Sequence, residues 1–589
     1  MAQPGDTSPM PAFLDVSDSL TGRRWIGPSL EEDRLAEAMA RDARLDRAVA
    51  LTLVRRGVGP DQAQGFLDPK LRDLLPDPLT LRDMALAADR LLQAVDRRER
   101  VAIFADYDVD GGASAALLLV WLRHFGLRAT LYIPDRIEEG YGPNEPAMAR
   151  LASAHDLILC VDCGTLSHGP IDAAAGCDVV VLDHHLGGET LPACLAVVNP
   201  NRQDETGDLG HLCAAGVVFL LLVEANRRLK ADGRQGPDLM ALLDLVALAT
   251  VADVAPLTGV NRALVRQGLV VMGQRKRPGI AALSDIAGLS TAPTCHHLGY
   301  VLGPRVNAGG RVGKADLGAR LLATDDPHEA QALAELLHAH NAERREIEAG
   351  VQAAALAQAE SRADGPLAWA AGEGWHPGVV GIVAARLKEA LNRPSVVIAL
   401  DGGIGKGSAR SVPGVDIGAA IQRVAAEGLL LRGGGHRMAA GLTVEQDKLA
   451  PAMARLAELL ARQGAGATGP RDLSLDGLLM PKAAQPPLVE TIERAGPFGA
   501  AAPSPRFAFS DLAVSMQRIV GNGHLKLAFT DGMGGRLDAI AFGAAEGPLA
   551  KLHPGAGRFH VAGRLEINTW QGRRNVQLLL EDAAPAGRR

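Results

Sequence analysis

Between about residues 100 and 185, short apolar runs alternate with longer stretches of helical periodicity. The runs are apolar on both faces, which is typical of parallel strands covered by helices on both sides. The predicted strands lie at 100–106, 128–135, 156–162 and 177–185, and the predicted helices between them lie at 112–126, 144–155 and 167–176. This rhythm predicts an α/β domain with a doubly wound parallel sheet.

The pattern changes after this domain. Residues 326–362 predict one long helix, which begins with a capping box formed by Asp326 and Glu329. Apolar and charged faces both persist along it, so a connector between domains is favoured over a member of a helical bundle. A second α/β unit follows, with strands at 366–375 and 394–400 around a helix at 379–391.

The last part of the chain contains short strands with turn signals between them. They lie at 506–520, 524–531, 536–542, 558–570 and 575–582. This spacing predicts a small antiparallel barrel. Four aromatic residues of this part are candidate stacking faces for bases, although most should be barrel core: Phe529, Phe542, Phe559 and Trp570.

A chain of 589 residues is too long for one hydrophobic core. Residues 1–98 read as a polar leader followed by short helices, to which the sequence assigns no role. The five predicted segments are 1–98 (leader region), 99–262 (first α/β domain), 263–362 (helical connector), 363–465 (second α/β domain) and 466–589 (barrel).

Composition limits the possible functions only slightly. A net charge of −7 argues against a protein that coats nucleic acid with its whole surface, but a local basic groove stays possible. From Arg506 onward the chain carries 11 Lys and Arg against 7 Asp and Glu. The six cysteines follow no disulfide pattern, and the pair Cys160 and Cys163 lacks a second pair for zinc, so a reducing cytoplasm is expected. Neither a signal peptide nor a membrane span is expected.

Acidic residues and histidines lie at the ends of three of the predicted parallel strands, and the helical stretch 240–257 contains a further acid near its end. In open parallel sheets, ligands bind beyond the carboxyl ends of the strands, so these side chains should meet in one crevice. Carboxylates gathered this closely repel each other unless a cation lies among them. The residues are Asp106, Asp108, Asp110, Asp162, Asp183, His184, His185 and Asp253.

A mixed set of Asp and His ligands favours Mn²⁺ or Mg²⁺ over a zinc–thiolate site. Two cations about 4 Å apart would activate water and hold the attacking and leaving oxygens of a phosphoester. One alternative is a calcium loop, because residues 106–111 resemble the start of an EF-hand. The twelfth position of that loop would be Leu117 instead of Glu, and no helix precedes it. A lone Asp after a strand is usually a helix cap, but here three strand ends carry acids.

The segments "DYDVDG", "VDCG", "LDHH" and "VADVAPL" resemble, in this order, the four motifs of the DHH phosphoesterase superfamily. Within it, "EGYGPN", "LGPRVNAGGR", "WHPGVVGIVAARLKE", "GKGSARS", "GGGHRMAAGL" and "GPFGAAAPSPRF" resemble the RecJ family of single-strand-specific exonucleases. The resemblance covers about residues 100–585. It implies a DHH domain, a DHH-associated substrate domain and a C-terminal oligonucleotide-binding (OB) barrel.

The resemblance implies two metal ions, Mn²⁺ or Mg²⁺, in one active site. Asp108 and Asp162 would hold the first ion. His185 would face the scissile phosphate, and Asp183 would orient the histidines. The ligands implied for the second ion are Asp110, Asp162, His184 and Asp253.

One position departs from the pattern of many superfamily members, which place a histidine four residues before Asp108. Here that position is Phe104. Asp106 or water would then complete the first metal site. The alternative is that Phe104 is the last core residue of its strand.

The resemblance also implies residues that bind the substrate. Ser408 and Arg410 match positions that hold the 5′ end of DNA, and His436 would lie near the substrate phosphate. Glycine-rich backbone can approach phosphate closely. The other implied substrate residues are Gly434, Gly435, Arg305, Asn307 and Arg311. For the glycine segment and for 303–311, the alternative is an ordinary structural turn.

The implied function is a 5′-to-3′ exonuclease that degrades single-stranded DNA to nucleoside 5′-monophosphates in DNA repair and recombination. It implies a monomer in the bacterial cytoplasm, with single-stranded DNA as substrate and a single-strand-binding protein and a helicase as candidate partners. One alternative is a DHH phosphodiesterase of short oligonucleotides or cyclic dinucleotides, which is usually shorter and lacks the barrel. A second alternative is a non-catalytic single-strand-binding scaffold, which the full set of acids and His184 disfavours.

Overall fold

The structure is a computed structural model, and it describes residues 12–136, 139–362, 365–466, 471–570 and 573–587, except for the side chain of Trp570. Its internal contacts divide the chain into two compact units. One unit contains residues 76–255 and 267–468, and the other joins the two ends of the chain with residues 256–266. Within the described part, none of the helices combines the length and the apolar character that a membrane crossing requires.

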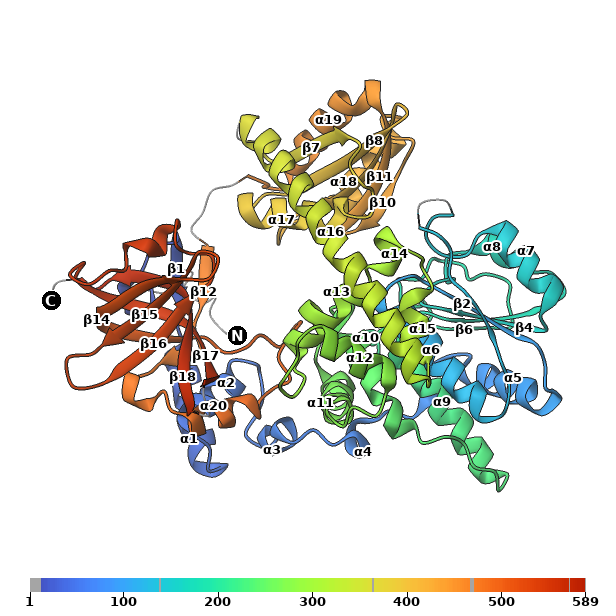
Figure 1. Cartoon of the computed structure of the whole chain (residues 1–589), viewed down its shortest axis with the longest axis horizontal. Coiled ribbons are helices and arrows are strands. Elements are labelled where there is room, and N and C mark those ends of the chain that lie inside the picture. Colours follow the sequence, from blue (N-terminus) through green and yellow to red (C-terminus); the bar gives the residue numbers. More distant parts are fainter. Residues whose placement is uncertain (1–11, 137–138, 363–364, 467–470, 571–572, 588–589) are drawn as a thin grey trace, which may run out of the picture. The chain divides into compact units, whose positions relative to one another are not determined.

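The first domain of the larger unit is built on a parallel sheet with strand order β3-β2-β4-β5-β6. Helices α6 (Val109–His124) and α9 (Ala214–Ala231) pack on one face and α7 (Glu145–Ala154) on the other (Figure 1). The strands are β2 (Val101–Ala105), β3 (Thr130–Tyr132), β4 (Leu157–Val161), β5 (Asp178–Leu182) and β6 (Ala196–Val198). The doubly wound fold is confirmed, and the sequence analysis missed only the edge strand β6.

The remaining helices of this domain surround the sheet or lead out of it. They are α5 (Met84–Arg97), α8 (His168–Asp172), α10 (Leu243–Ala252), α12 (Pro278–Ile286), α13 (Gly303–Val306), α14 (Gly309–Val312) and α15 (Leu317–Ala323). Helix α11 (Gly259–Gly273) begins in residues 256–266 of the smaller unit and ends in the larger one. Helix α6 contacts α9, α10 and α15, and it is buried over most of its length. Its first turn is therefore held rigidly at the end of β2.

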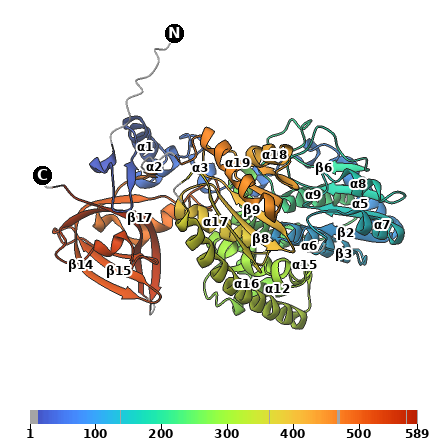
Figure 2. The ribbon, with the colours of Figure 1, turned by 90° about the horizontal axis from the view of Figure 1, so that it is seen from above.

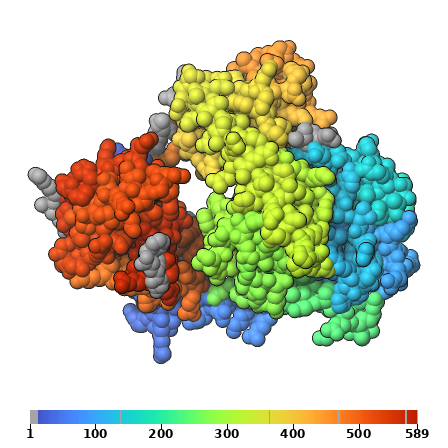
Figure 3. Space-filling view, viewed as in Figure 1, coloured from blue at the N-terminus to red at the C-terminus, as the bar shows by residue number. Residues whose placement is uncertain are grey.

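The long predicted helix is α16 (Pro327–Ser361). Its first half packs on α12 and α15, and its second half packs on β7 (Ala368–Glu373) and α17 (Val380–Leu391), so it connects two domains, as Figures 1 and 3 show. The predicted capping box does not form as expected. Asp326 caps the backbone N–H of His328, but Glu329 instead accepts hydrogen bonds from Thr324 Oγ1 and Arg320 Nη2.

The second domain is a mixed five-stranded sheet with order β10-β11-β9-β8-β7. Only β7 and β8 pair in parallel. Figure 2 shows α17 beside α16 and β9, and these contacts fix the domain against the long helix. The further elements are β8 (Ser395–Asp401), β9 (Ile404–Arg410), α18 (Ile417–Ala426), β10 (Arg432–His436), β11 (Ala439–Glu445) and α19 (Leu449–Arg462).

The smaller unit contains the predicted barrel, with strand order β13-β14-β15-β16-β18-β17 and a closing pair β14–β17. The expectation of a wholly antiparallel barrel is wrong, because β16 pairs with β18 in parallel. Strand β17 closes the barrel on β14, so β18 returns beside β16 in the same direction. The strands are β13 (Gly477–Leu478), β14 (Phe507–Val520), β15 (His524–Thr530), β16 (Arg536–Ala541), β17 (Arg558–Trp570) and β18 (Arg573–Pro585).

The barrel shares its hydrophobic core with the beginning of the chain. Met39, Leu51 and Leu53 from the N-terminal helices lie in one buried cluster with Phe509 and Phe529 of the barrel. Strand β1 pairs in parallel with β12, so the leader region completes this unit. The elements involved are β1 (Arg23–Ile26), α1 (Leu30–Asp42), α2 (Arg47–Val54), α3 (Ala63–Leu67), α4 (Leu71–Leu74), β12 (Arg471–Ser474) and α20 (Pro486–Glu493).

The candidate stacking aromatics of the barrel differ in their exposure to solvent. Phe529 and Phe559 are buried in the core, whereas Phe542 is 65% exposed. The side chain of Trp570 lies outside the described residues. Of the three that are described, Phe542 is therefore the one with a face available to a base.

Candidate functional site

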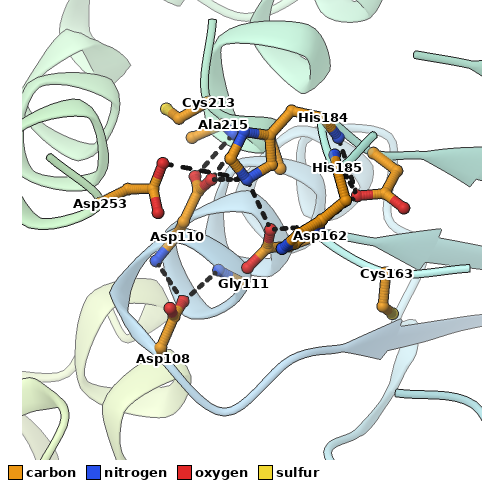
Figure 4. A network of polar contacts seen from close by, with 12 residues as sticks. Asp108, Asp110, Gly111, Asp162, Cys163, His184, His185, Cys213, Ala215 and Asp253 are labelled. Carbon is orange, nitrogen blue, oxygen red and sulfur yellow. Dashed lines mark hydrogen bonds and ion pairs between the residues drawn. The ribbon is translucent and has the colours of Figure 1, made fainter. Parts of the chain in front are cut away.

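The acids that follow the strands converge at one edge of the parallel sheet. Because β2, β4 and β5 are neighbours in the sheet, Asp108, Asp162 and His184 come together where these strands end. Figure 4 shows their side chains pointing toward one another, with Asp253 approaching from the end of α10. This convergence is what the rule for strand ends predicts.

Backbone N–H groups at the starts of α6 and α9 hold two of the acids. Asp108 is the N-cap, and its Oδ1 accepts from the N–H groups of Asp110 (2.8 Å) and Gly111 (3.1 Å). Asp110 accepts from Ala214 (2.6 Å) and Ala215 (2.8 Å) at the start of α9. A side chain at Gly111 would place its Cβ 2.4 Å from the carbonyl oxygen of Asp106, so only glycine fits there.

His184 lies at the centre of the cluster. Its Nε2 is 3.2 Å from Asp162 Oδ1, 3.7 Å from Asp110 Oδ2 and 3.8 Å from Asp253 Oδ2. Asp162 has a positive φ of 59°, which is costly for a non-glycine residue and typical of functional sites. One imidazole nitrogen thus faces three carboxylates from three different elements.

His185 is held by the buried Asp183. Asp183 Oδ1 accepts from the His185 ring Nδ1 at 2.8 Å, and its Oδ2 accepts from Thr165 Oγ1 at 2.7 Å. Burial alone would lower the pKa of His185, but the hydrogen bond and the charge of Asp183 outweigh it and raise the pKa to about 9. The other ring nitrogen lies 3.3 Å from the hydroxyl of Tyr141, which donates to the carbonyl of Asp162. Asp183 therefore orients the ring of His185 directly, whereas it contacts only the backbone of His184.

The electrostatics of the cluster favour the binding of a cation. Burial, reinforced by the neighbouring carboxylates, raises the pKa of Asp106 and of Asp162, and it raises the pKa of Asp253 to about 8. Asp106 Oδ1 and Asp162 Oδ1 are buried, and neither accepts a hydrogen bond from the described residues. Buried carboxylate oxygens without donors are what a divalent cation would satisfy.

Among the described residues, three sets of side chains place their ligand atoms within 4.8 Å of one another. Asp162 belongs to two of the sets and His184 to two. The donors are carboxylate oxygens and imidazole nitrogens, which fit Mn²⁺ or Mg²⁺. The sets are Asp106–Asp108–Asp162, Asp110–His184–Asp253 and Asp162–His184–His185.

Phe104 lies in the hydrophobic core of the first domain. Its side chain is fully buried in the core under α7, and its ring centroid lies 5.4 Å from that of Tyr132. Phe104 thus packs the sheet, which favours the second of the two interpretations of this position.

The implied substrate residues of the second domain lie on its central and edge strands. Arg410 Nη1 on β9 donates to Ser408 Oγ at 2.9 Å. Gly434, Gly435 and the exposed His436 lie on the edge strand β10. The structure thus brings Ser408 and Arg410 together, while the three residues of β10 lie two strands away in the sheet.

Arg136 was missed by the sequence analysis. It lies in a polar stretch after β3, and its guanidinium group lies over the ring of Tyr107, with 5.0 Å between the guanidinium carbon and the ring centroid. Its positive charge repels the charges of two predicted substrate residues. Burial is the largest cause of the lowered pKa of Arg410, and the charge of Arg136 is the second; the same two causes lower the pKa of Arg311 to about 10. Repulsion between cations of this kind is relieved by an anion.

A cavity of about 570 Å³ lies between α13, α14, α16 and α17. The implied substrate residues Arg305, Asn307 and Arg311 line it, and the amide oxygen of Asn307 is buried without a partner among the described residues. Three further arginines were not predicted, because single arginines on helices carry no pattern. These are Arg344, Arg345 and Arg386, and the one acid in the lining is Glu348.

Comparison with protein families matches three models to this chain. A DHH family N-terminal domain matches residues 100–250, a DHHA1 domain matches residues 364–462, and a RecJ OB domain matches residues 475–582. The three matches cover the parallel-sheet domain, the mixed-sheet domain and the barrel.

Relatives with known names match over most of the chain. The single-stranded-DNA-specific exonuclease RecJ of Dickeya dadantii is 39% identical over 540 residues, which are 88% of this chain and 93% of the relative. The RecJ of Escherichia coli is 36% identical over 543 residues, with the same shares of the two chains.

A solved structure confirms the likeness at the level of the fold. The crystal structure of RecJ from Thermus thermophilus in complex with Mn²⁺ matches with a TM-score of 0.79 and 32% identity, over 95% of this chain and 79% of that one. The identities, the coverage and the three domain matches agree with the geometry of the metal cluster. The chain belongs to the RecJ family of single-stranded-DNA-specific exonucleases.

Proposed function

We propose that this protein is a metal-dependent exonuclease that removes nucleoside 5′-monophosphates from the 5′ end of single-stranded DNA. The observation that carries the proposal is a pair of buried carboxylate oxygens, Asp106 Oδ1 and Asp162 Oδ1, which accept no hydrogen bond from the described residues and belong to the candidate ligand sets. Such a site needs divalent cations, and a pair of them is suited to hydrolysing phosphodiesters.

The proposal assigns two ions to this site. Asp108 and Asp162, with Asp106, would hold one ion, and Asp110, Asp162, His184 and Asp253 would hold the other. Asp162 would then contact both ions, which agrees with its place in two of the three ligand sets. When bound, the ions would supply an activated water and stabilise charge on the phosphoester oxygens.

Protein side chains would orient the substrate around these ions. His185 is held by Asp183 and lies in one ligand set with Asp162 and His184, so it would face the scissile phosphate at the ions. We assign the contact near the substrate phosphate in the second domain to His436, with Gly434 and Gly435 offering close backbone approach.

The 5′ end would be bound by Ser408 and Arg410, and we add Arg136 to them because its charge acts on Arg410. The two arginines would offset the charge of a terminal phosphate, and Arg305, Asn307 and Arg311 would hold the phosphates that follow. The arginine-lined cavity supports this path, because a polyanion would relieve the repulsion among its cations.

Several other expectations stay predictions. They are the role in repair and recombination, the monomeric state, the cytoplasmic location, and the single-strand-binding protein and helicase as partners. The division of the chain at residues 98, 262, 362 and 465 also stays a prediction.

Digestion of end-labelled strands tests the proposed function. With Mn²⁺, a single strand labelled at its 5′ end should release the label at once as a mononucleotide, whereas a strand labelled at its 3′ end should shorten step by step. Blunt double strands should resist digestion. Release of the 3′ label first, or equal rates on single and double strands, would contradict the proposal.

The variant Arg410→Ala tests the assignment of the 5′ end within the same assay. A charge-assisted hydrogen bond contributes about 1.5–3 kcal/mol, so binding of 5′-phosphorylated strands should weaken about 10- to 100-fold. Strands with a 5′-hydroxyl should lose less. Arg423→Ala, which removes an exposed arginine of α18, is the control. Equal losses on both kinds of strand would remove Arg410 from this role.

The stabilisation by Mn²⁺ should increase with pH. Asp253 has a pKa of about 8 in the fold, above that of an unfolded aspartate, so metal-free protein loses stability as pH rises through 8. Metal competes with protons for these carboxylates and binds better as they ionise. We expect the rise in melting temperature on adding Mn²⁺ to be at least about twice as large at pH 8.5 as at pH 6. Asp253→Asn should flatten this dependence, and equal increments in the unchanged protein would refute the coupling.

A further inference from the structure

The loop that follows β6 contacts the two histidines that follow β5. Asn201 Nδ2 donates to the carbonyl oxygen of His184 at 2.6 Å, and Asn199 Nδ2 donates to that of His185 at 2.8 Å. Asn199 is fully buried and Asn201 half-buried. Each histidine thus has its backbone carbonyl held by its own asparagine side chain.

The opposite side of the same backbone is held by Asp183. Its Oδ1 accepts from the N–H of His184 at 2.8 Å and from the N–H of His185 at 3.2 Å. All four backbone polar groups of the two histidines are therefore bound by side chains. Such a backbone segment has little freedom to turn, so the direction in which each imidazole leaves it is set.

The two asparagines are themselves held in place. Asn199 Oδ1 accepts from the N–H of Asn201 at 2.7 Å, and Asn199 Nδ2 also donates to Thr165 Oγ1 at 2.8 Å. Asn201 Nδ2 also donates to the carbonyl of Gly210 at 3.2 Å, and a Cβ at Gly210 would lie 2.6 Å from Asn201 Oδ1. The amide of Asn201 thus fits a space that a larger residue at position 210 would close.

We propose that Asn199 and Asn201 are positioning residues for His184 and His185. They hold the backbone so that His184 Nε2 stays within 3.2–3.8 Å of the carboxylates of Asp162, Asp110 and Asp253. Groups that hold a metal ligand in this way raise metal affinity without touching the metal. The inference rests on the proposed metal site.

A simpler interpretation is that the asparagines only stabilise a loop. The chain offers a matched control for this. Asn226 is also half-buried in the same unit, and its Nδ2 donates to the carbonyl of Pro237 at 2.8 Å. It also accepts from Trp121 Nε1, on the face of α6 that packs on α9. A purely structural role would make Asn201→Ala and Asn226→Ala behave alike.

The test measures Mn²⁺ binding to the full-length protein by electron paramagnetic resonance of the free ion. Asn201→Ala should raise the dissociation constant about 10-fold or more, and Asn226→Ala should leave it within about twofold of the unchanged protein. The Mn²⁺ concentration that gives half of the maximal nuclease rate should rise in parallel. The rate at saturating Mn²⁺ should largely recover, because no metal ligand has been removed.

Thermal melting shows whether each variant folds. If Asn201→Ala does not fold, Asn201→Ser replaces it, because its shorter hydroxyl still donates and an intermediate loss of affinity is expected. Unchanged Mn²⁺ affinity in a folded Asn201 variant, or an equal loss in Asn226→Ala, would overturn the inference. Absence of Mn²⁺ binding to the unchanged protein would instead contradict the proposed function.

Discussion

Asp162→Asn should lower the exonuclease rate more than about 100-fold, because one carboxylate belongs to two of the three ligand sets. The same substitution should raise the melting temperature of metal-free protein. Burial, together with the charges of Asp110 and Asp108, raises the pKa of Asp162, which means that its ionised form is unfavourable in metal-free protein. Removing the charge removes that cost.

Opposite changes in activity and stability distinguish a metal ligand from a structural residue. Measurements of rate and of melting temperature with and without Mn²⁺ check the prediction, and the added Mn²⁺ should no longer stabilise the variant. Asp172→Asn, at an exposed position of α8, removes one charge from the same domain and should change neither quantity. A variant at position 162 that keeps more than about a hundredth of the activity would refute the bridging role.

Trp25→Ala should destabilise the smaller unit by about 3–5 kcal/mol. Trp25 is fully buried, and its Nε1 donates to Asp582 Oδ2 at 2.8 Å in the last barrel strand. The substitution leaves a cavity and also removes a donor from a carboxylate that is itself fully buried. For a unit of this size the melting temperature should fall by about 6–20 °C.

Calorimetry of the full chain checks this, since the transition of the smaller unit should shift. Trp25→Phe, which keeps most of the volume but lacks the N–H, should give a smaller loss and so separates packing from the hydrogen bond. Mn²⁺ affinity should be unchanged, because the ligands of the proposed site all belong to the larger unit. A shift below about 2 °C for Trp25→Ala would show that the leader region is not part of the barrel core.

The sequence by itself determined most of the fold and of the metal cluster. Apolar runs bounded by acids predict β2, β4 and β5, and parallel strands bring their carboxyl ends to one edge. The sequence alone therefore places Asp108, Asp162 and His184 together. Parallel direction and hydrogen-bonded register place the ends of neighbouring strands side by side, so the side chains at those ends must lie close together.

Residues without a local pattern could not be found in this way. Asn199 and Asn201 stand in an "NPN" segment that is typical of a turn. Their contacts with the histidines depend on β6 pairing with β5, and β6 was not predicted. Arg136 likewise belongs to a polar stretch, and only the folded chain brings its charge to Arg410 and Arg311.

The tertiary structure alone decided the role of the leader region. Trp25 is apolar, so the sequence predicts that it is buried. The hydrophobic effect is not directional, however, and the sequence pattern does not indicate in which hydrophobic core Trp25 packs. In the structure it packs with Ala508, Ala562 and Ala584 and bonds to Asp582, more than 550 residues away along the chain. Such pairings follow from shape complementarity and from the need to satisfy a buried carboxylate, which exist only once both segments have folded.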